Sequence, residues 1–250
     1  MRQRLRIGRA WIDVLRFDEA LREIERLVDC GRGGSVFTPN VDHLVLADED
    51  AEFRAAYSAA SLCLADGMPL VWMLRALGAG QATRVYGPNL TLEILHAAEA
   101  AAIPVGFYGS TQEVLGCLLN RLGRRFPALS IAFAQAPPFC PLTPKEDDET
   151  VRVIHASGAK ILFIGLGGTK QDLWMTDHRG RVPAVMIGVG AAFDFLARTK
   201  PQAPRWMQDS GLEWLFRLAT EPRRLWRRYL RHNPRFAVRA VAQILRARFT

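Results

Sequence analysis

The sequence has few of the residues from which metal sites and disulfide frameworks are built. Its five histidines are scattered, and neither Cys-x-x-Cys nor His-Glu-x-x-His occurs in the 250 residues. Isolated cysteines are typical of buried thiols in a reducing compartment, and the chain has four of them: Cys30, Cys63, Cys117 and Cys140. We therefore expect no disulfide framework and no metal site built by the protein.

Long apolar segments are also absent. No stretch reaches the roughly 18 apolar residues of a membrane-spanning helix. The basic N-terminus, MRQRLRIGRAWIDV, has no apolar run of signal-peptide length. The longest apolar segments have the length of a β-strand, so any membrane contact is expected to be peripheral.

Positive charge is concentrated near the C-terminus. The chain has 33 Lys and Arg against 25 Asp and Glu, a net charge of +8. Residues 205–250 contain 11 Arg and three acidic residues and carry that whole excess, whereas residues 1–204 are balanced. This asymmetry predicts an anionic partner for the tail, either a membrane surface or a nucleic acid.

Apolar segments of strand length alternate with helical patterns over the first 195 residues. The helical patterns include Val41–Ala60 and Ser110–Arg125. Such alternation predicts an α/β fold with a Rossmann-like, mostly parallel sheet and helices on both faces, which binds ligands beyond the carboxyl ends of its strands. The predicted strands are Gly34–Thr38, Ser61–Ala65, Pro104–Tyr108, Leu129–Phe133, Lys160–Ile164 and Ala184–Ile187.

Prolines mark the main breaks in this pattern. Pro137–Glu149 is predicted to be a surface loop that leads into a helix starting near Thr143-Pro144. A second break, at Arg198–Pro204, separates a predicted catalytic domain, residues 1–200, from a helical, Arg-rich appendage, residues 201–250.

The appendage reads as three short helices, one around Trp206–Ala219 and two that begin at Pro222 and Pro234. In the second and third helices, apolar and aromatic residues share one face and arginines lie beside it. Basic amphipathic helices of this kind bind membrane interfaces. The alternative is that the apolar faces pack on the domain and the arginines are only solvated.

Three polar residues follow the first two predicted strands. Asp66 could act as a general base, since burial in a cleft raises the pKa of a carboxylate. It could instead be the N-cap of the next helix. Thr38 and Asn40 could donate hydrogen bonds into the same crevice, or could form a turn and helix cap around Pro39.

Glycine turns follow two later strands. Gly165–Gly168 and Gly188–Gly190 permit close approach of a phosphate, although neither completes G-x-G-x-x-G. Lys170 and Gln171 place a cation and an amide just after the first turn. Asp194 could hold a ribose or base, or could be an ordinary surface carboxylate.

Several motifs together resemble the WecG/TagA/CpsF glycosyltransferases. The run GLEWLFRLATEPRRLWRRYL at Gly211–Leu230 is similar to the family's C-terminal signature. The resemblance covers nearly all of residues 35–232, and the upstream motifs occur in the family's order: TPN at Thr38–Asn40, ADG at Ala65–Gly67, RVYG at Arg84–Gly87, GLGGTKQD at Gly165–Asp172, GVGAAFDFLA at Gly188–Ala197 and AP-RWM at Ala203–Met207.

The resemblance implies an inverting, metal-independent transfer of a sugar, often N-acetylmannosamine, from UDP to an undecaprenyl-diphosphate-linked saccharide. It implies no cofactor, a hexosyltransferase or N-acetylhexosaminyltransferase activity in cell-surface polysaccharide synthesis, and attachment to the cytoplasmic face of the membrane. Its partners would be the UDP-sugar, the polyprenyl-linked acceptor, an anionic membrane surface and possible further copies of the chain, with no nucleic acid.

The resemblance also assigns roles to residues. Asp66 would be the base, with Thr38 and Asn40 in the same pocket. The donor-binding candidates are Arg84, Gly109, Phe139, Gly165, Gly167, Lys170, Gln171 and Asp194. The candidates for binding the acceptor diphosphate are Arg217, Arg224, Arg227 and Arg228.

Four positions depart from the family pattern. Thr169 and Asp172 stand where proline and glutamate are usual, and Arg198 and Gln202 replace a usual glycine and arginine. These changes leave the identity of the sugar open.

Two other functions fit parts of the sequence. A nucleic-acid-binding protein could use the basic tail, since the pI is about 9.8. Another nucleotide-dependent α/β enzyme, such as a methyltransferase, could use Gly188–Gly190 as a cofactor loop. A thermal-shift panel of UDP, UDP-sugars and S-adenosylmethionine would separate the enzymes.

Overall fold

The computed structural model describes residues 2–138 and 140–249. They divide into two compact units. The first unit comprises the chain up to Ala20, Thr38–Tyr86 and the chain from Gln202 on. The second comprises Leu21–Phe37 and Gly87–Pro201. The helix α1 (Phe17–Asp29) crosses from the first unit into the second.

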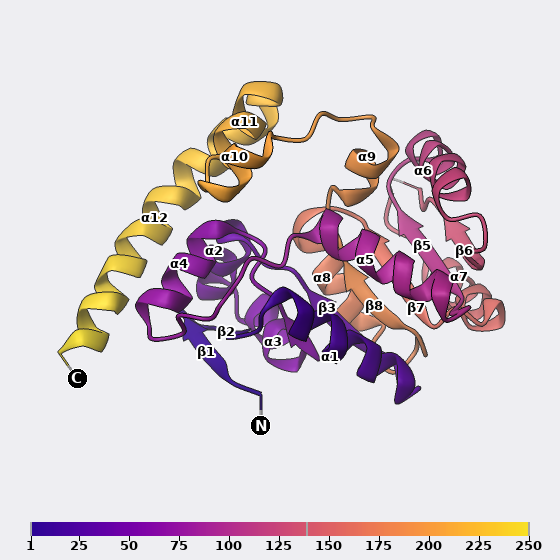
Figure 1. The fold of residues 1–250 in the computed structure, drawn as a ribbon, viewed down its shortest axis with the longest axis horizontal. Coiled ribbons are helices and arrows are strands. Elements are labelled where there is room, and N and C mark those ends of the chain that lie inside the picture. The colour runs from indigo at the N-terminus through magenta and orange to yellow at the C-terminus, as the bar shows by residue number, and fades with distance from the viewer. Residues whose placement is uncertain (1, 139, 250) are drawn as a thin grey trace. The chain divides into compact units, whose positions relative to one another are not determined.

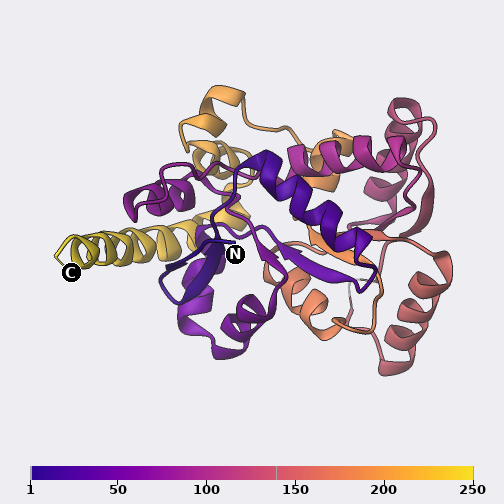
Figure 2. The same cartoon turned by 60° about the horizontal axis from the view of Figure 1, so that its bottom comes forward.

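The second unit contains a parallel sheet covered by helices on both faces. Its strands pair in the order β3-β8-β7-β5-β6, and every pair is parallel. Figure 2 shows α5 on one side of this sheet and α7 and α8 on the other. The elements are β3 (Gly34–Phe37), α5 (Gly87–Ala100), β5 (Val105–Gly109), α6 (Gln112–Arg125), β6 (Ile131–Gln135), α7 (Pro144–Ser157), β7 (Ile161–Gly165), α8 (Gly168–Asp177), β8 (Val185–Gly188) and α9 (Ala192–Ala197).

The central strands are apolar throughout because both of their faces are buried. All five residues of β5 and all four of β8 are buried. In the core, the Phe107 ring stacks on Phe163 at 5.3 Å and meets Phe193 edge-on at 5.7 Å between centroids. The predicted α/β class with a parallel sheet is confirmed.

The predicted start of the helix after the proline-rich loop is also confirmed. Thr143 caps α7 by accepting a hydrogen bond from the Glu146 backbone N–H at 3.4 Å, and the Glu146 carboxylate accepts from the Thr143 backbone N–H at 2.7 Å. Pro144 occupies the first turn, where a missing N–H costs no helical bond.

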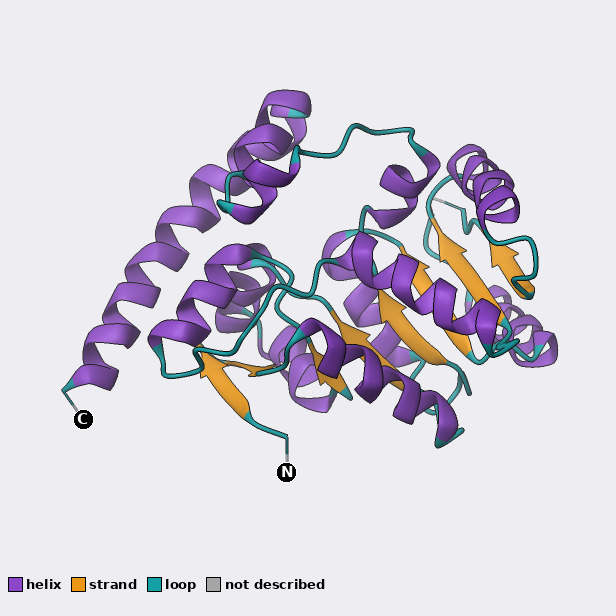
Figure 3. Ribbon diagram, in the orientation of Figure 1, coloured by secondary structure: helices purple, strands orange, loops and turns teal. Residues whose placement is uncertain are grey.

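The first unit combines a hairpin, short helices and the C-terminal region (Figure 3). The predicted helix Val41–Ala60 is two helices, because Asp50 ends one and caps the next by accepting from the Glu52 and Phe53 N–H groups. The elements are β1 (Arg4–Ile7) and β2 (Ala10–Asp13), which pair antiparallel, and then α2 (Val41–Glu49), α3 (Ala51–Ala59), β4 (Leu62–Cys63), α4 (Met68–Ala76), α10 (Arg205–Asp209), α11 (Glu213–Thr220) and α12 (Pro222–Arg248).

The prediction of three helices with breaks before Pro222 and Pro234 is wrong in two places. The first predicted tail helix is divided at Gly211, which has φ +70° and where an added Cβ would lie 2.5 Å from the Trp72 ring. In contrast, α12 continues through Pro234. Proline removes one helical hydrogen bond, but contacts of α12 with α2 on both sides of Pro234 stabilise one continuous helix.

Those contacts are ion pairs between α2 and α12, which run side by side in the first unit (Figure 1). Asp42 pairs with His232 and, at 3.5 Å, with Arg228. Glu49 lies 2.8 Å from Arg235, and Asp48 lies 2.9 Å from Arg239. Gln243 adds hydrogen bonds to the Gly8 N–H and the Arg6 carbonyl. We call these contacts the α2–α12 clamp.

The tail is thus part of one compact unit with Thr38–Tyr86. The division into a catalytic domain, residues 1–200, and a membrane-associating appendage, residues 201–250, remains a prediction about function. Leu225 is the buried residue of α12. On the outer side of the helix, Leu230 and Val238 are 70% and 71% exposed. No helix among residues 2–138 and 140–249 is long and apolar enough to cross a membrane.

Candidate functional site

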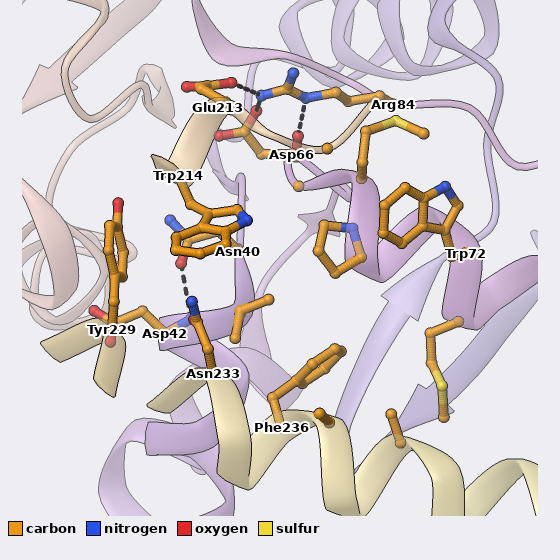
Figure 4. A pocket seen from close by; sticks show the side chains of 18 of the residues that line it. Asn40, Asp42, Asp66, Trp72, Arg84, Glu213, Trp214, Tyr229, Asn233 and Phe236 are labelled. Atoms are coloured by element: carbon orange, nitrogen blue, oxygen red, sulfur yellow. Dashed lines mark hydrogen bonds and ion pairs between the residues drawn. The ribbon is translucent and has the colours of Figure 1, made fainter. Parts of the chain in front are cut away.

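A pocket of about 590 Å³ lies wholly within the first unit (Figure 4). Its polar end holds Asp66 and Arg84 from the loops around α4, and Glu213 from α11. Apolar side chains of α4 and α12, such as Trp72 and Phe236, line the rest. The pocket is therefore amphiphilic.

Asp66 lies in this pocket and does not cap the helix that follows it. The N-cap of α4 is Gly67, and no side chain caps that end. The Asp66 backbone N–H donates to the Pro39 carbonyl at 3.1 Å, which ties the two polar loops together. The Asp66 side chain is 19% exposed. Its position fits a ligand-facing carboxylate better than the capping alternative.

Thr38 and Asn40 precede α2 in the same unit. Thr38 is buried, with 7% exposure. Asn40 lines the pocket and also caps α2, because its side-chain oxygen accepts from the Asp42 N–H at 2.9 Å. Asn40 is therefore a helix cap that also lines the pocket, and its hydrogen bonding to a ligand stays a prediction.

Arg84 connects Asp66 to the tail. Its Nε donates to the Asp66 carbonyl oxygen, and its Nη2 lies 3.5 Å from the Asp66 carboxylate and 2.5 Å from that of Glu213. The guanidinium also lies over the Tyr86 ring, 4.1 Å from its centroid. Burial disfavours its charged form, but Asp66 and Glu213 outweigh that effect and raise the pKa of Arg84.

Glu213 is the residue on which this cluster centres. Its second carboxylate oxygen lies 2.7 Å from Arg217 Nη2 and 3.5 Å from the Tyr86 hydroxyl. Burial and the negative charges of Glu213 and Asp66 raise the pKa of Tyr86 well above its usual range. Burial opposes the charge of Arg217, but Glu213 and Asp66 overcome this and raise the pKa of Arg217. Two carboxylates and two guanidiniums thus form a balanced, partly buried network.

Glu213 is not among the site residues predicted from the sequence. It lies in the Gly211–Leu230 motif, where the residues expected to bind a diphosphate are arginines. The motif has two acidic residues, Glu213 and Glu221, and Glu213 is the one that lies among apolar residues. A carboxylate in an apolar segment is rarely buried unless it is paired with a cation.

The four arginines predicted to bind diphosphate divide into two pairs. Arg217 and Arg228 line the pocket and are 29% and 33% exposed. Arg224 and Arg227 do not line it. Arg224 is 62% exposed and pairs with Glu221 at 2.5 Å, and Arg227 lies 5.2 Å from the Trp226 ring centroid.

The second unit holds the glycines of the predicted donor side at the carboxyl ends of β5 and β7. Gly109 and Gly165 are register partners, and a Cβ on Gly109 would lie 2.5 Å from the Gly165 backbone. Gly109 has φ +132°, so glycine is required there for conformation as well as for space. Gly167, with φ +81°, is the N-cap of α8 and has no side chain that could satisfy the first N–H groups of that helix.

The remaining donor-side candidates of the second unit differ in exposure. Gln171 is 2% exposed, and its side-chain oxygen accepts from the Gly190 N–H at 3.0 Å, which joins the two glycine turns. Lys170 is exposed on α8. Asp194, in the first turn of α9, lies 3.5 Å from Lys200. Phe139 lies outside the described residues.

Two of the departures from the family pattern have structural consequences. Arg198 ends α9 with φ +58°, a left-handed conformation that favours the usual glycine. Gln202 donates to the Tyr86 hydroxyl at 3.0 Å and so adjoins the Glu213 network of the first unit. Nothing in the structure explains the substitution at Thr169.

The described residues contain no group of three or more His, Cys, Asp or Glu side chains arranged to hold a metal ion. The expectation of a reaction without metal is not tested by this observation and remains a prediction.

The pattern of one protein family matches almost the entire chain. It is described as the Glycosyl transferase WecG/TagA/CpsF family, and the match covers residues 5–250. The matched region includes both units, with the pocket around Asp66 and the glycine turns of the parallel sheet. The chain therefore belongs to the WecG/TagA/CpsF family of glycosyltransferases.

Proposed function

We propose that this glycosyltransferase moves a sugar, N-acetylmannosamine or a related hexose, from a UDP-sugar to an undecaprenyl-diphosphate-linked saccharide. The sugar is transferred with inversion, without a metal or cofactor, in the synthesis of a cell-surface polysaccharide. The observation that carries the proposal is the position of Asp66, a pocket carboxylate that is not needed as a helix cap.

In the proposed reaction, Asp66 accepts the proton of the acceptor hydroxyl. The oxygen attacks the anomeric carbon of the donor sugar from the face opposite to UDP. A new carbon–oxygen bond forms as the bond to the UDP phosphate breaks, and UDP leaves with that electron pair. One base on the acceptor side is sufficient for such a displacement.

Arg84 positions the base in this scheme. It contacts both the backbone carbonyl and the carboxylate of Asp66, so that the side chain is held from two directions. Because Glu213 shares the charge of Arg84, Asp66 is not its sole ion-pair partner. Such sharing leaves the carboxylate accessible as a proton acceptor.

The diphosphate groups of donor and acceptor require cations when no metal is present. On the donor side, the glycine turns of Gly165–Gly168 and the exposed Lys170 offer N–H groups and a positive charge. On the acceptor side, Arg217 and Arg228 face the pocket. Guanidinium groups bind phosphate oxygens in a bidentate manner, which suits this role.

We further propose that the enzyme works at the cytoplasmic face of the membrane. Arg224 and Arg227 are exposed and do not line the pocket, and Leu230 and Val238 are exposed on the same helix. Arginines near an anionic leaflet each contribute about 1 kcal/mol to attachment. Several such residues with exposed apolar side chains support reversible, peripheral binding.

The proposal is tested by replacing Asp66 with Asn. We expect turnover with a UDP-sugar and a lipid-linked acceptor to fall about 100-fold or more, while UDP binding measured by calorimetry stays near that of the wild type. Asp209→Asn is the matched control, since Asp209 is exposed in the same unit and does not line the pocket. Wild-type-like transfer by Asp66→Asn would exclude Asp66 as the base, and retention of the anomeric configuration in the product would exclude inversion.

A further inference from the structure

The apolar part of the pocket is a groove that begins at the candidate base and runs along two helices. On α4, the lining residues Met68, Trp72 and Ala76 recur at helical spacing, and Met68 is two residues after Asp66. On α12, the lining residues continue from Tyr229 to Ile244. Tyr229 and Ile244 are 15 residues apart, so the lining residues form a stripe about 22 Å long on this helix.

The stripe changes character along α12. Its beginning is polar, with Arg228, Tyr229 and Asn233 in the lining. From Phe236 on, the lining residues are apolar or small: Phe236, Ala237, Ala240, Val241 and Ile244. A ligand that fits this groove has a polar, anionic head near the arginines and an apolar body that extends away from Asp66.

The groove is held open by the way in which α12 is attached. The α2–α12 clamp fixes one side of the helix through ion pairs to Asp42, Asp48 and Glu49. Ala237 and Ala240 on α12 and Ala76 on α4 line the groove with small side chains, which leave space between the helices. Trp72 and Val241 remain 48% and 57% exposed, so the groove is accessible along its length.

We propose that this groove binds the first isoprene units of the acceptor's polyprenyl chain, with the diphosphate at the Arg217–Arg228 end. The inference rests on the proposed function, in which the acceptor is a prenyl diphosphate. A cavity of about 590 Å³ holds about 20 heavy atoms if each takes up about the 30 Å³ of a water molecule, which is enough for three five-carbon units and the phosphate group attached to them.

The charge at one end of the groove and the exposed apolar side chains beyond its other end favour a prenyl diphosphate as the ligand. The polar end adjoins a helix start rich in arginine, which suits a diphosphate and not a neutral apolar peptide. The apolar end leads to Leu245 and Phe249, which are 50% and 87% exposed. Leu245 and Phe249 thus extend the apolar surface beyond the groove, and the neighbouring Arg246 and Arg248 suit anionic lipid headgroups.

Calorimetry of the full chain with three soluble probes tests the proposal without any turnover: inorganic diphosphate, geranyl diphosphate and farnesyl diphosphate. We expect one site per chain and an affinity that rises about 30-fold with each added isoprene unit, which is the gain from half-burying five carbons. Equal affinity for the three probes, or several farnesyl diphosphate molecules per chain, would overturn the proposal.

A groove-filling variant locates the site. Ala240→Trp should reduce the gain from geranyl to farnesyl diphosphate to less than about threefold, because the added ring occupies the apolar end. Ala242→Trp is the control on the same helix, since Ala242 is exposed and does not line the groove. A full chain-length gain in Ala240→Trp would refute the location.

The proposed reaction is measured separately. If the wild type binds farnesyl diphosphate as expected but releases no UDP from any UDP-sugar with a lipid-linked acceptor, the groove stands and the transfer reaction is refuted. If UDP is released at rates that do not depend on prenyl length, and binding is equally independent of it, the reaction stands and the groove is refuted.

Discussion

The charge of Glu213 is predicted to hold the pocket network together. The substitution Glu213→Gln keeps the size of the side chain and removes its negative charge. Glu213 is 12% exposed and its carboxylate contacts Arg84 at 2.5 Å and Arg217 at 2.7 Å. After the substitution, Asp66 is the only one of the two network carboxylates left beside these guanidiniums.

The size of the effect follows from the burial of the three side chains. Breaking a fully buried ion pair costs about 3–5 kcal/mol, and an exposed pair is worth about 0–1 kcal/mol. Arg84 and Arg217 are 14% and 29% exposed, and glutamine can still accept hydrogen bonds. We therefore expect a loss of about 2 kcal/mol in the free energy of unfolding, between the two limits. For a chain of this size the melting temperature falls by roughly 4–8 °C.

The assay is a double-mutant cycle. Glu213→Gln, Arg84→Gln and the double variant are compared by thermal unfolding, and we expect a coupling free energy of about 1–2 kcal/mol. Glu221→Gln is the matched control, since Glu221 pairs with Arg224 at a similar distance, 2.5 Å, but the Arg224 side chain is 62% exposed. That control should lose less than about 1 kcal/mol.

Activity provides a second measurement. Because Arg84 holds Asp66, we expect Glu213→Gln to lower kcat/KM about tenfold, whereas Glu221→Gln should leave it near the wild-type value. If the effects of Glu213→Gln and Arg84→Gln add to within about 0.5 kcal/mol, the two side chains act independently and the network has no energetic role.

Other predictions follow from single features of the two units. Arg198→Gly should raise the melting temperature by about 1–3 °C in a thermal scan, because it relieves the left-handed conformation at the end of α9, and a decrease would contradict this. Arg217→Gln should lower turnover even with a water-soluble acceptor, whereas Arg224→Gln should lower it only when the acceptor lies in a bilayer, and equal effects on both assays would contradict the division of the arginines. Val238→Asp should weaken flotation with anionic liposomes without changing UDP binding, because Val238 is exposed on α12. Unchanged flotation would contradict membrane contact through this side of the helix. Turnover should be unchanged in EDTA, and a loss restored by Mg²⁺ or Mn²⁺ would reveal a metal requirement.

The sequence predicted the parallel sheet well because each central strand is apolar on both faces and ends in glycine or a polar turn. The segment Lys160–Ile164 is an example, since β7 occupies Ile161–Gly165 and its first four residues are buried. The N-terminal hairpin was not predicted. Its strands have only four residues each, too few for a clear alternation of polar and apolar positions.

Long-range contacts account for most of the remaining differences. Pro234 predicted a helix start from local rules, but the clamp to α2 favours one continuous helix. The capping alternative for Asp66 could not be judged from neighbouring residues, because its position depends on Arg84 and Glu213. The joining of residues 38–86 with the tail in one unit likewise depends on charges far apart in the sequence.

The clamp also changes how the charge of the tail should be counted. Arg235 and Arg239 are paired with the α2 carboxylates of Glu49 and Asp48, so the attraction to an anionic surface comes from fewer arginines than the composition suggests. Because each pair joins a fixed position on α2 to one on α12, a change of sign on one helix is tolerated best with the opposite change on the other. Among homologous sequences, positions 49 and 235, and positions 48 and 239, are therefore expected to exchange charge together.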